Sequence, residues 1–372
     1  MFITLFLLCL LLFLRGTPAP KGCFYDDALS AKSVLPLRGF FMLLVMLHHT
    51  SQLMREPGAF VLLHDIGILC VSFFFFLSGY GLMKNHRQNP DYFHAFFRRR
   101  FTKLFIPFFV CNLLFILIDI AQGISYSPRY LAECLLGFTL INSHAWFILT
   151  TALFNLAFFA IFRFGKNHLL QYTLLAAFWF GYAAFCIRRG EGLHLFEGPW
   201  WFNSSCLFFF GVLFADFEPE IFHILKKYYR KLAMIGLFCF LLFYTVALFV
   251  TDAFPYIKND GNPLSYHMLS SWFCLAWQSL AVFMFCLLII LFSMKFRSHN
   301  KLLLFLGTHA IELYLLHGLF IWLYKGELIV IENNLLFVLA VLFSSFLSAF
   351  LLHYPLKFLI REVQNELEKL PF

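Results

Sequence analysis

The chain has few charged residues. Asp, Glu, Lys and Arg make up 13% of its 372 residues, whereas an average soluble domain contains about 25%. Hydrophobic residues account for 61%, and phenylalanine alone contributes 55 residues. So little charge cannot cover the surface of a water-soluble protein of this length. The composition therefore argues against a soluble globular protein and indicates a chain whose main solvent is lipid.

Two signatures of metal-binding and nucleic-acid-binding proteins are also missing. The ten cysteines are scattered singly and include no CxxC pair, which argues against a disulfide framework and against a cysteine metal site. The formal net charge is +8, but the basic residues lie beside apolar segments and form no basic domain. We therefore expect no bound metal and no nucleic acid partner.

Long uncharged segments recur along the chain. A helix needs about 20 residues to cross a hydrocarbon slab of ~30 Å. Seven uncharged segments reach or approach this length: Ile66–Met83, Ala145–Phe162, Leu169–Ile187, Gly198–Ala215, Leu232–Thr251, Leu269–Met294 and Asn333–Leu356. Three more segments of this length are interrupted by polar residues: Val34–Met54, Thr102–Ala121 and Leu302–Tyr324. The segments lack the alternation of polar and apolar residues that is typical of the strands of a membrane β-barrel. The sequence therefore predicts an all-α bundle of about ten transmembrane helices.

The distribution of Lys and Arg predicts the orientation of this bundle. The connections after the second, fourth, sixth and eighth segments carry more than twice as many basic residues as the alternate connections. By the positive-inside rule, these connections and both termini face the cytoplasm of a plasma or inner membrane. We expect an N-terminal apolar segment and flank over 1–31, a transmembrane domain over 32–360 and a cytoplasmic tail over 361–372. Met1–Leu14 is short for a crossing, and is either an extra anchor or a misassigned start.

The first predicted span contains two ionisable residues, Arg38 and His49. Such residues cost ~2.5–3.5 kcal/mol each on insertion scales and usually mark a functional site. The two are eleven positions apart, about 16 Å along a helix and on the same face, whereas His48 points ~100° away. If the next turn is tight, Asp65 lies at the depth of His49 and could orient it as in a His–Asp pair. Alternatively, Arg38 is a snorkelling anchor and His49 a helix-packing residue.

The second span ends in FFFFLSGYGLM. Its Ser78 and Gly79 allow close approach of another helix and place a hydroxyl near the cytoplasmic side, with Tyr80 beside it. Helix packing alone is an equally good explanation of this segment.

A basic cluster follows in FHAFFRRRFTKLFIP and comprises Arg98, Arg99, Arg100 and Lys103. Guanidinium groups bind phosphate oxygens bidentately, so this cluster could hold the phosphates of an anionic cofactor such as CoA. It could equally be a topology signal or a contact for anionic lipids.

The ninth span, LGTHAIELYLLHGLF, places His309, Glu312 and His317 in an apolar helix. Glu312 follows His309 by three residues, so the two side chains could pair. One of the three could line a water-filled path for an acceptor. A structural pair is the alternative.

In their order and spacing, these segments resemble the acyltransferase-3 family of multispanning membrane acyltransferases, which O-acylate polysaccharides, lipid-linked glycans and related cell-envelope molecules. Arg38, ten intervening residues and His49 resemble the family's Arg-x10-His signature. FFFFLSGYGL resembles its FFxxSGF/Y segment, and FFRRRFTKLFIPFF resembles its basic stretch before the third helix. AWFILTTALF and ELYLLHGLF resemble its WFL and YLxH-like segments. The resemblance covers roughly residues 32 to 360.

The resemblance implies acyl transfer from acyl-CoA, with acetyl-CoA as the expected donor, to a hydroxyl of a sugar or lipid-linked glycan. It assigns His49 as the catalytic base or acyl-handling residue. The residues it assigns to the donor are Arg38, Arg99, Arg100 and Lys103, with Arg98 beside them, and it lets Ser78 and Tyr80 shape the pocket.

Two positions depart from the family pattern. Ser72 stands where the family often has an acidic residue. Lys103 occupies the second basic position of the family's basic stretch, and its ammonium group cannot bind a phosphate bidentately as an arginine guanidinium does.

Two other functions remain open from the sequence. A proton-coupled transporter of a small envelope metabolite would use His49, Asp65 and Glu312 as a proton relay. Such transporters usually have inverted repeats with broken helices, which the sequence does not show. A non-enzymatic assembly factor would leave the ionisable residues replaceable. The oligomeric state is not indicated.

Overall fold

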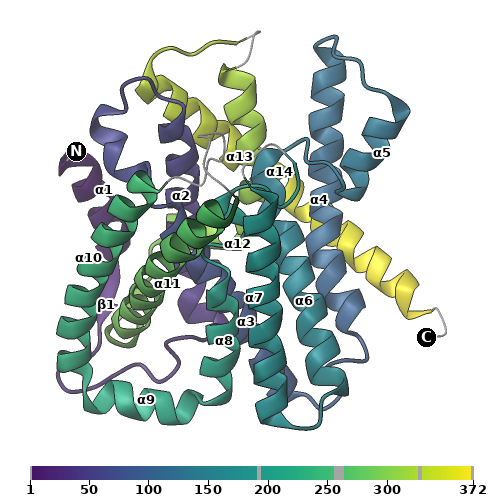
Figure 1. Cartoon of the computed structure of the whole chain (residues 1–372). Coiled ribbons are helices and arrows are strands. Elements are labelled where there is room, and N and C mark those ends of the chain that lie inside the picture. Colours follow the sequence, from purple (N-terminus) through teal and green to yellow (C-terminus); the bar gives the residue numbers. More distant parts are fainter. Residues whose placement is uncertain (1, 191–193, 255–263, 326–328, 370–372) are drawn as a thin grey trace.

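The computed structural model describes residues 2–190, 194–254, 264–325 and 329–369, which form a bundle of helices (Figure 1). The helices are α1 (Phe2–Phe13), α2 (Ala31–Gln52), α3 (Gly67–Gln88), α4 (Phe96–Ala121), α5 (Pro128–Leu136), α6 (Trp146–Phe164), α7 (His168–Arg189), α8 (Cys206–Asp216), α9 (Glu218–Lys227), α10 (Tyr229–Ala253), α11 (Leu264–Lys295), α12 (Lys301–Thr308), α13 (Ala310–Lys325) and α14 (Asn334–Glu368). Short 3-10 helices are η1 (Gly58–Leu63), η2 (Ser143–Ala145) and η3 (Pro199–Trp201). The prediction of an all-α fold is confirmed.

Within the described residues, eight helices are long and apolar enough to cross a membrane. A ninth crossing results if α12 and α13, which meet at a bend of 83°, count as one span. The remaining predicted span, Gly198–Ala215, contains η3 and then α8, a helix of 11 residues. At 1.5 Å per residue, α8 is only about 16 Å long and does not cross a bilayer alone. The bundle architecture thus agrees with the sequence, with one predicted span shortened and another bent.

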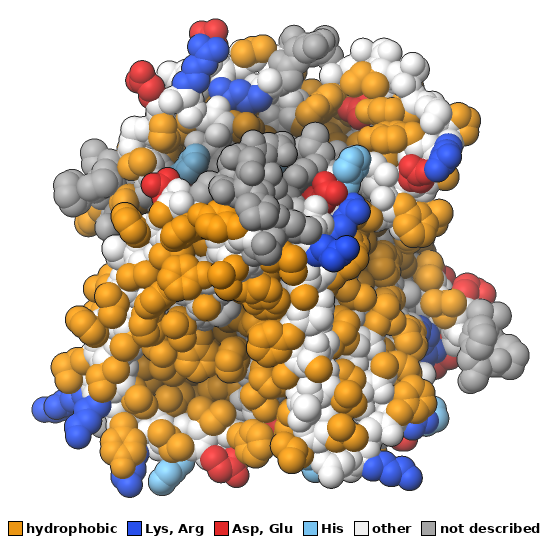
Figure 2. All heavy atoms as spheres, viewed as in Figure 1, with side chains coloured by type: hydrophobic (Ala, Val, Ile, Leu, Met, Phe, Trp, Pro, Cys, Tyr) orange, Lys and Arg blue, Asp and Glu red, His pale blue; other side chains and the backbone are white. Residues whose placement is uncertain are grey.

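The outer surface of the bundle has the pattern expected of a membrane protein. Figure 2 shows a broad hydrophobic band, with Lys, Arg, Asp and Glu side chains gathered above and below it. Large apolar side chains such as Phe238, Phe249 and Phe343 are about 70% exposed in this protein. Such exposure is unfavourable in water and expected in lipid.

The segments predicted to be cytoplasmic lie on one side of the molecule. Strand β1 (Gly16–Pro18) pairs antiparallel with β2 (Phe296–Ser298), so the N-terminal flank meets the connection after α11. Asp27 forms an ion pair with Arg297, and Asp26 forms one with Lys226 just before α10. Helix α9 lies across this end of the bundle (Figure 1). The contacts are consistent with the orientation derived from the positive-inside rule.

The two ends of the chain differ in detail from the predicted segments. Helix α14 continues to Glu368, so the expected tail after residue 360 begins as part of a helix. Arg98 forms an ion pair of 2.9 Å with Glu368, which holds the end of α14 beside α4. Helix α1 has only 12 residues, and its Phe13 ring packs against Phe292 and Phe296.

Glycines allow two helix pairs to approach at backbone distance: α3 with α8, and α2 with α12 at Gly39 and Gly307. On α3, Gly79 faces the carbonyl of Phe208 in α8, and Gly211 of α8 faces the carbonyl of Phe76. A Cβ atom at either position would overlap the facing backbone. The sequence prediction of close approach at Gly79 is therefore confirmed, and this contact fixes the helix that carries Ser78 and Tyr80.

We expect Gly79→Ala to lower the free energy of unfolding by about 1–3 kcal/mol, the usual cost of overpacking. Its methyl group would collide with the backbone of α8, which cannot give way as a flexible side chain could. Thermal unfolding of the purified protein in detergent measures the effect. Gly81→Ala is the matched control, because it lies on the same helix with open space around its Cβ position. Equal melting temperatures for the two variants would contradict this account of the contact.

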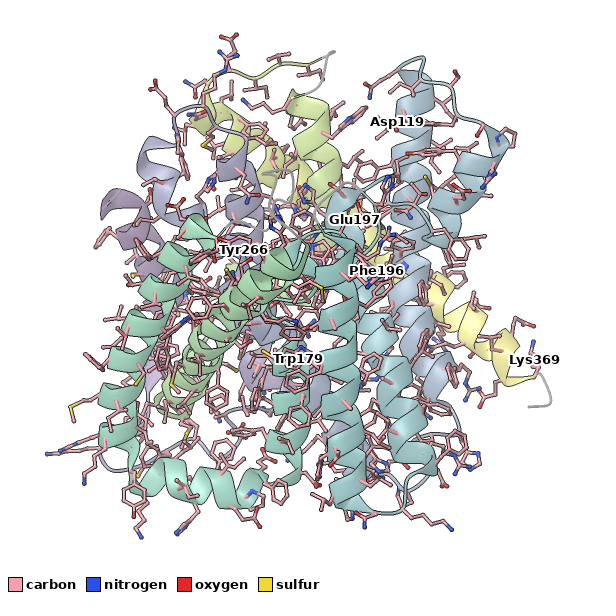
Figure 3. All side chains as sticks on the ribbon, in the orientation of Figure 1. Asp119, Trp179, Phe196, Glu197, Tyr266 and Lys369 are labelled. Atoms are coloured by element: carbon pink, nitrogen blue, oxygen red, sulfur yellow. The ribbon has the colours of Figure 1, made fainter. Side chains whose placement is uncertain are left out.

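Two other polar bonds link helices to neighbouring segments. The Trp179 indole of α7 donates a hydrogen bond of 3.1 Å to Ser205 at the start of α8. At the end of α4, the hydroxyl of Tyr126 donates a bond of 2.5 Å to Asp119. Figure 3 labels Trp179 and Asp119 at these two places.

Candidate functional site

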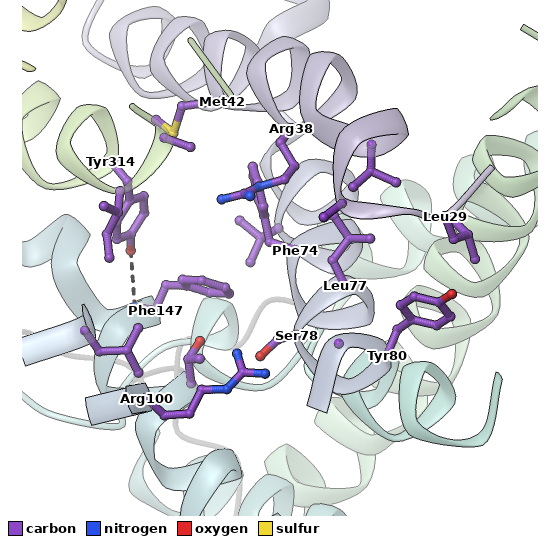
Figure 4. Close-up of a pocket in the computed structure, with 18 of the residues that line it drawn as sticks. Leu29, Arg38, Met42, Phe74, Leu77, Ser78, Tyr80, Arg100, Phe147 and Tyr314 are labelled. Atoms are coloured by element: carbon purple, nitrogen blue, oxygen red, sulfur yellow. Dashed lines mark hydrogen bonds between the residues drawn. The ribbon is translucent and has the colours of Figure 1, made fainter. Parts of the chain in front are cut away.

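A cavity of about 670 Å³ lies between α2, α3, α4, α6 and α13. We call it the inner cavity, because it lies toward the side predicted to be cytoplasmic. Its polar lining includes Ser30, Arg38, Ser78, Tyr80, Lys84, Asn85, Gln88, Arg100, Thr151 and Tyr314. Figure 4 shows Arg38 and Arg100 extending into this space, with the Ser78 hydroxyl at its wall. Among the described lining residues, three side chains are cations and none is a carboxylate. The cavity is therefore suited to an anion.

Arg38 is the cation in this cavity with the most unused hydrogen-bonding capacity. It is partly buried, and within the described residues it makes no hydrogen bond and no ion pair. The carboxylate that attracts it electrostatically is Glu312 of α13, whose Oε1 atom is already bonded to His353 Nδ1 at 2.8 Å. The five N–H donors of Arg38 thus remain available to an anionic group in the cavity.

The basic cluster predicted on α4 does not converge on the cavity. Only Arg100 lines it, and its Nε donates a hydrogen bond of 3.0 Å to the Tyr92 hydroxyl. Arg98 is held by Glu368, while Arg99 and Lys103 are exposed outside the lining. Successive helical residues point about 100° apart, so neighbours in sequence spread around the helix.

Ser78 and Tyr80 both line the inner cavity, and Lys84 joins them. The Tyr80 hydroxyl donates a hydrogen bond of 2.6 Å to Glu218 Oε1, and Lys84 forms an ion pair with the other oxygen of this carboxylate. Lys84 was not among the predicted site residues. It stands four positions after Tyr80, so helical periodicity could have placed both on one face.

A second cavity, of about 520 Å³, surrounds the C-terminal end of α2. We call it the outer cavity, because it lies toward the side opposite the predicted cytoplasmic side. Its polar and aromatic lining includes His48, His49, Gln52, His64, Asp65, Ser143, His144, Trp146, Trp200, Asn203, Ser204, Tyr244, Thr251, Gln278 and Tyr314. Val45, Val71 and Tyr314 line both cavities. Arg38 and His49 therefore lie in adjoining cavities along one face of α2, as the sequence spacing suggested.

His49 is oriented by Gln52 rather than by Asp65. Its Nδ1 atom lies 3.3 Å from Gln52 Oε1, whereas the structure gives no hydrogen bond between His49 and Asp65. Asp65 lines the same cavity, and its backbone carbonyl accepts a hydrogen bond of 3.2 Å from Tyr244. The tight turn assumed for the pairing is replaced by η1, which lengthens the connection.

His48 also lines the outer cavity, which the sequence analysis did not expect. Its Nδ1 atom donates a hydrogen bond of 3.0 Å to the carbonyl of Leu63 in η1. The segment containing η1 folds back over the end of α2. A residue that points ~100° away from His49 therefore still meets the cavity.

Two further histidines approach His49. Its ring centre is 4.2 Å from that of His144 and 5.3 Å from that of His317, and the other two rings are 5.2 Å apart. His317 was predicted only as a secondary candidate, and it is fully buried. His144 was missed, although it directly precedes the AWFILTT segment at the membrane face predicted for His49.

The turn that carries His144 is fixed to α13 by side-chain hydrogen bonds. Asn142 Nδ2 donates a bond of 2.8 Å to the carbonyl of Leu315, and Asn142 Oδ1 accepts a bond of 3.1 Å from the backbone N–H of His144. The Tyr314 hydroxyl donates to the carbonyl of His144 and accepts a bond of 3.2 Å from the N–H of Phe147. The bonds therefore fix the backbone of His144 relative to α13, which carries His317.

The proposed pairing of Glu312 with His309 is not formed. Glu312 pairs instead with His353 of α14, and His309 Nδ1 donates a hydrogen bond of 2.8 Å to the carbonyl of Phe305. Because the helix bends by 83° between α12 and α13, residues 309 and 312 do not follow one helical ridge. Neither residue lines the two cavities.

Comparison with known protein families agrees with this arrangement. A family model described as an acyltransferase domain, that of the acyltransferase-3 family, matches residues 37–354. The matched range covers most of the chain and contains the lining of the outer cavity and most of the lining of the inner cavity. No curated protein and no solved structure matched the chain. The protein is a multi-pass membrane protein, and it belongs to the acyltransferase-3 family.

Proposed function

We propose that this membrane acyltransferase moves an acyl group from acyl-CoA in the inner cavity to a hydroxyl group in the outer cavity. The observation that carries the proposal is the pair of adjoining cavities, one cationic and one containing a cluster of imidazoles. A donor and an acceptor approaching from opposite sides of the membrane would meet where these cavities join.

The chemistry of the inner cavity supports a CoA thioester as donor. CoA carries phosphate groups, and Arg38, Lys84 and Arg100 supply positive charge and N–H donors for them. The remaining lining is largely apolar, with side chains such as Met42 and Leu77. Such a lining suits the uncharged part of CoA between its phosphates and its thioester, and also a short acyl chain. An acetyl group is the expected cargo.

The outer cavity suits a sugar or a lipid-linked glycan of the cell envelope. Aromatic side chains of Trp146, Trp200 and Tyr244 offer flat apolar faces. Gln52 and Asn203 add amide groups that can both donate and accept hydrogen bonds. Apolar faces combined with a few placed polar groups are typical of a site for a hydroxylated ring.

His49 is the base in this proposal. Its Nδ1 atom donates to Gln52 Oε1, so Nε2 carries the free lone pair. Nε2 takes the proton of the acceptor hydroxyl while the oxygen attacks the thioester carbonyl carbon. A C–O bond forms, the C–S bond breaks, and the CoA sulfur leaves as a thiolate that then takes up a proton. Arg38, about 16 Å away along α2, holds the anionic part of the donor rather than the reacting carbonyl.

The direct test has two parts. Purified protein in lipid nanodiscs is supplied with radiolabelled acetyl-CoA and an envelope glycan fraction, and transfer of label to the glycan is measured. Mass spectrometry then compares glycans from cells with and without the protein, where we expect the loss of one acyl mass. Identical glycan masses together with no transfer from acetyl-CoA or longer acyl-CoA would overturn the proposal.

A further inference from the structure

The histidine cluster of His49, His144 and His317 is arranged as a set of metal ligands. One ring nitrogen from each residue lies within 4.8 Å of the other two. The three come from α2, η2 and α13, which are far apart in the sequence and are held together by the bonds of Asn142 and Tyr314. Three neutral imidazoles are a common ligand set for zinc and related divalent transition metals.

The hydrogen bonds of two of these rings leave one nitrogen free for a ligand role. His317 Nδ1 donates to the carbonyl of Leu313 at 3.1 Å, so its Nε2 carries the lone pair. This Nε2 atom is buried and has no hydrogen-bond partner in the described part of the chain. His49 Nδ1 is bonded to Gln52 Oε1 in the same manner. Metal-bound histidines usually donate their other ring N–H to a carbonyl or carboxylate oxygen, which fixes the tautomer.

The spacing of the rings agrees with a shared ion. With metal–nitrogen bonds of about 2.1 Å and tetrahedral angles, the ring centres of three imidazoles lie about 5 Å apart. The observed separations are 4.2, 5.2 and 5.3 Å. The three rings are therefore already gathered at nearly the separations that a shared ion requires.

We propose that His49, His144 and His317 bind one divalent transition-metal ion of the zinc class. The outer cavity, which His49 and His144 line, gives the ion a path to the site and leaves its fourth position open. Asp65 lines the same cavity and adds a carboxylate to it.

The inference goes beyond the proposed function. A bound ion would occupy Nε2 of His49, the atom that acts as the base in the proposed transfer. A molecule with the ion bound therefore cannot use this atom as the base. Metal binding is measured without any acyl donor or acceptor. Failure of the metal site and failure of the acyl transfer are therefore separate results.

The test uses Co²⁺ as a spectroscopic probe for zinc. The purified full chain in detergent, stripped of metal with a chelator, is titrated with Co²⁺, and the visible d–d absorption is recorded. We expect bands of a four-coordinate ion at one equivalent, and their loss when Zn²⁺ is added. His317→Gln and His144→Gln should each weaken Co²⁺ binding by at least about 100-fold, because each removes a ligand.

The matched control is His309→Gln. His309 is a buried histidine on the same broken span, and its Nδ1 also donates to the carbonyl four residues earlier, but it lies outside the cluster. This variant should bind Co²⁺ as the wild type does. Absence of tetrahedral bands in the folded wild type would overturn the proposal, and so would equal binding by the His317→Gln and wild-type proteins.

Discussion

Replacing His49 with alanine is expected to lower the rate constant of acyl transfer by roughly 10²–10⁴-fold, the range for loss of a positioned general base. The remaining cluster histidines cannot replace it fully, because His317 is completely buried and His144 is fixed by η2 and Tyr314. The rate is measured with radiolabelled acetyl-CoA and the glycan acceptor under saturating donor. The KM for acyl-CoA should change little, since the inner cavity keeps its cations.

Two controls separate a catalytic effect from a loss of structure. His223→Ala changes an exposed histidine on α9, outside both cavities, and should retain the wild-type rate. Size-exclusion chromatography and thermal unfolding should show that the His49→Ala protein is folded. A folded His49→Ala variant with the full transfer rate would remove His49 from the mechanism.

The membrane bundle could be predicted because its signal is local. Each long span is an apolar run whose length is set by the bilayer, so hydropathy alone finds helices such as α10 and α14. The shortened α8 and the bend between α12 and α13 could not be read in this way. Their apolar residues are equally compatible with a full span. In the structure α8 packs closely on α3 at Gly79, and α12 packs closely on α2 at Gly307, and hydropathy does not report such contacts between distant segments.

The site could be predicted only where its residues share one helix. Arg38 and His49 were placed on one face of α2 by helical geometry, and the two adjoining cavities agree with that. His49, His144 and His317 lie on three segments that are far apart in the sequence. Their spacing in the sequence therefore does not predict that they cluster in the fold. Conversely, adjacency in sequence suggested one phosphate clamp on α4, whereas the helix turns Arg99 and Arg100 to different sides.

Replacing Arg38 with glutamine is expected to raise the KM for acyl-CoA roughly 10–100-fold, since a hydrogen bond to a charged group contributes about 1.5–3 kcal/mol. The guanidinium lies partly buried in the inner cavity and has no bonded partner among the residues that the structure describes, so the donor would lose its contacts directly. The value of kcat should change less, because Arg38 is about 16 Å from His49 along α2. Steady-state rates at increasing acyl-CoA concentration separate the two constants.

Two comparisons show whether the effect belongs to the cavity. Arg38→Lys keeps the charge but loses the planar fork, so its KM should lie between those of the wild type and Arg38→Gln. On α4, Arg100→Gln should raise the KM more than Arg99→Gln, because Arg100 lines the cavity and Arg99 is exposed outside it. An Arg38→Gln enzyme with wild-type KM, or equal effects at residues 99 and 100, would mean that the donor is bound elsewhere and that the inner cavity serves another purpose.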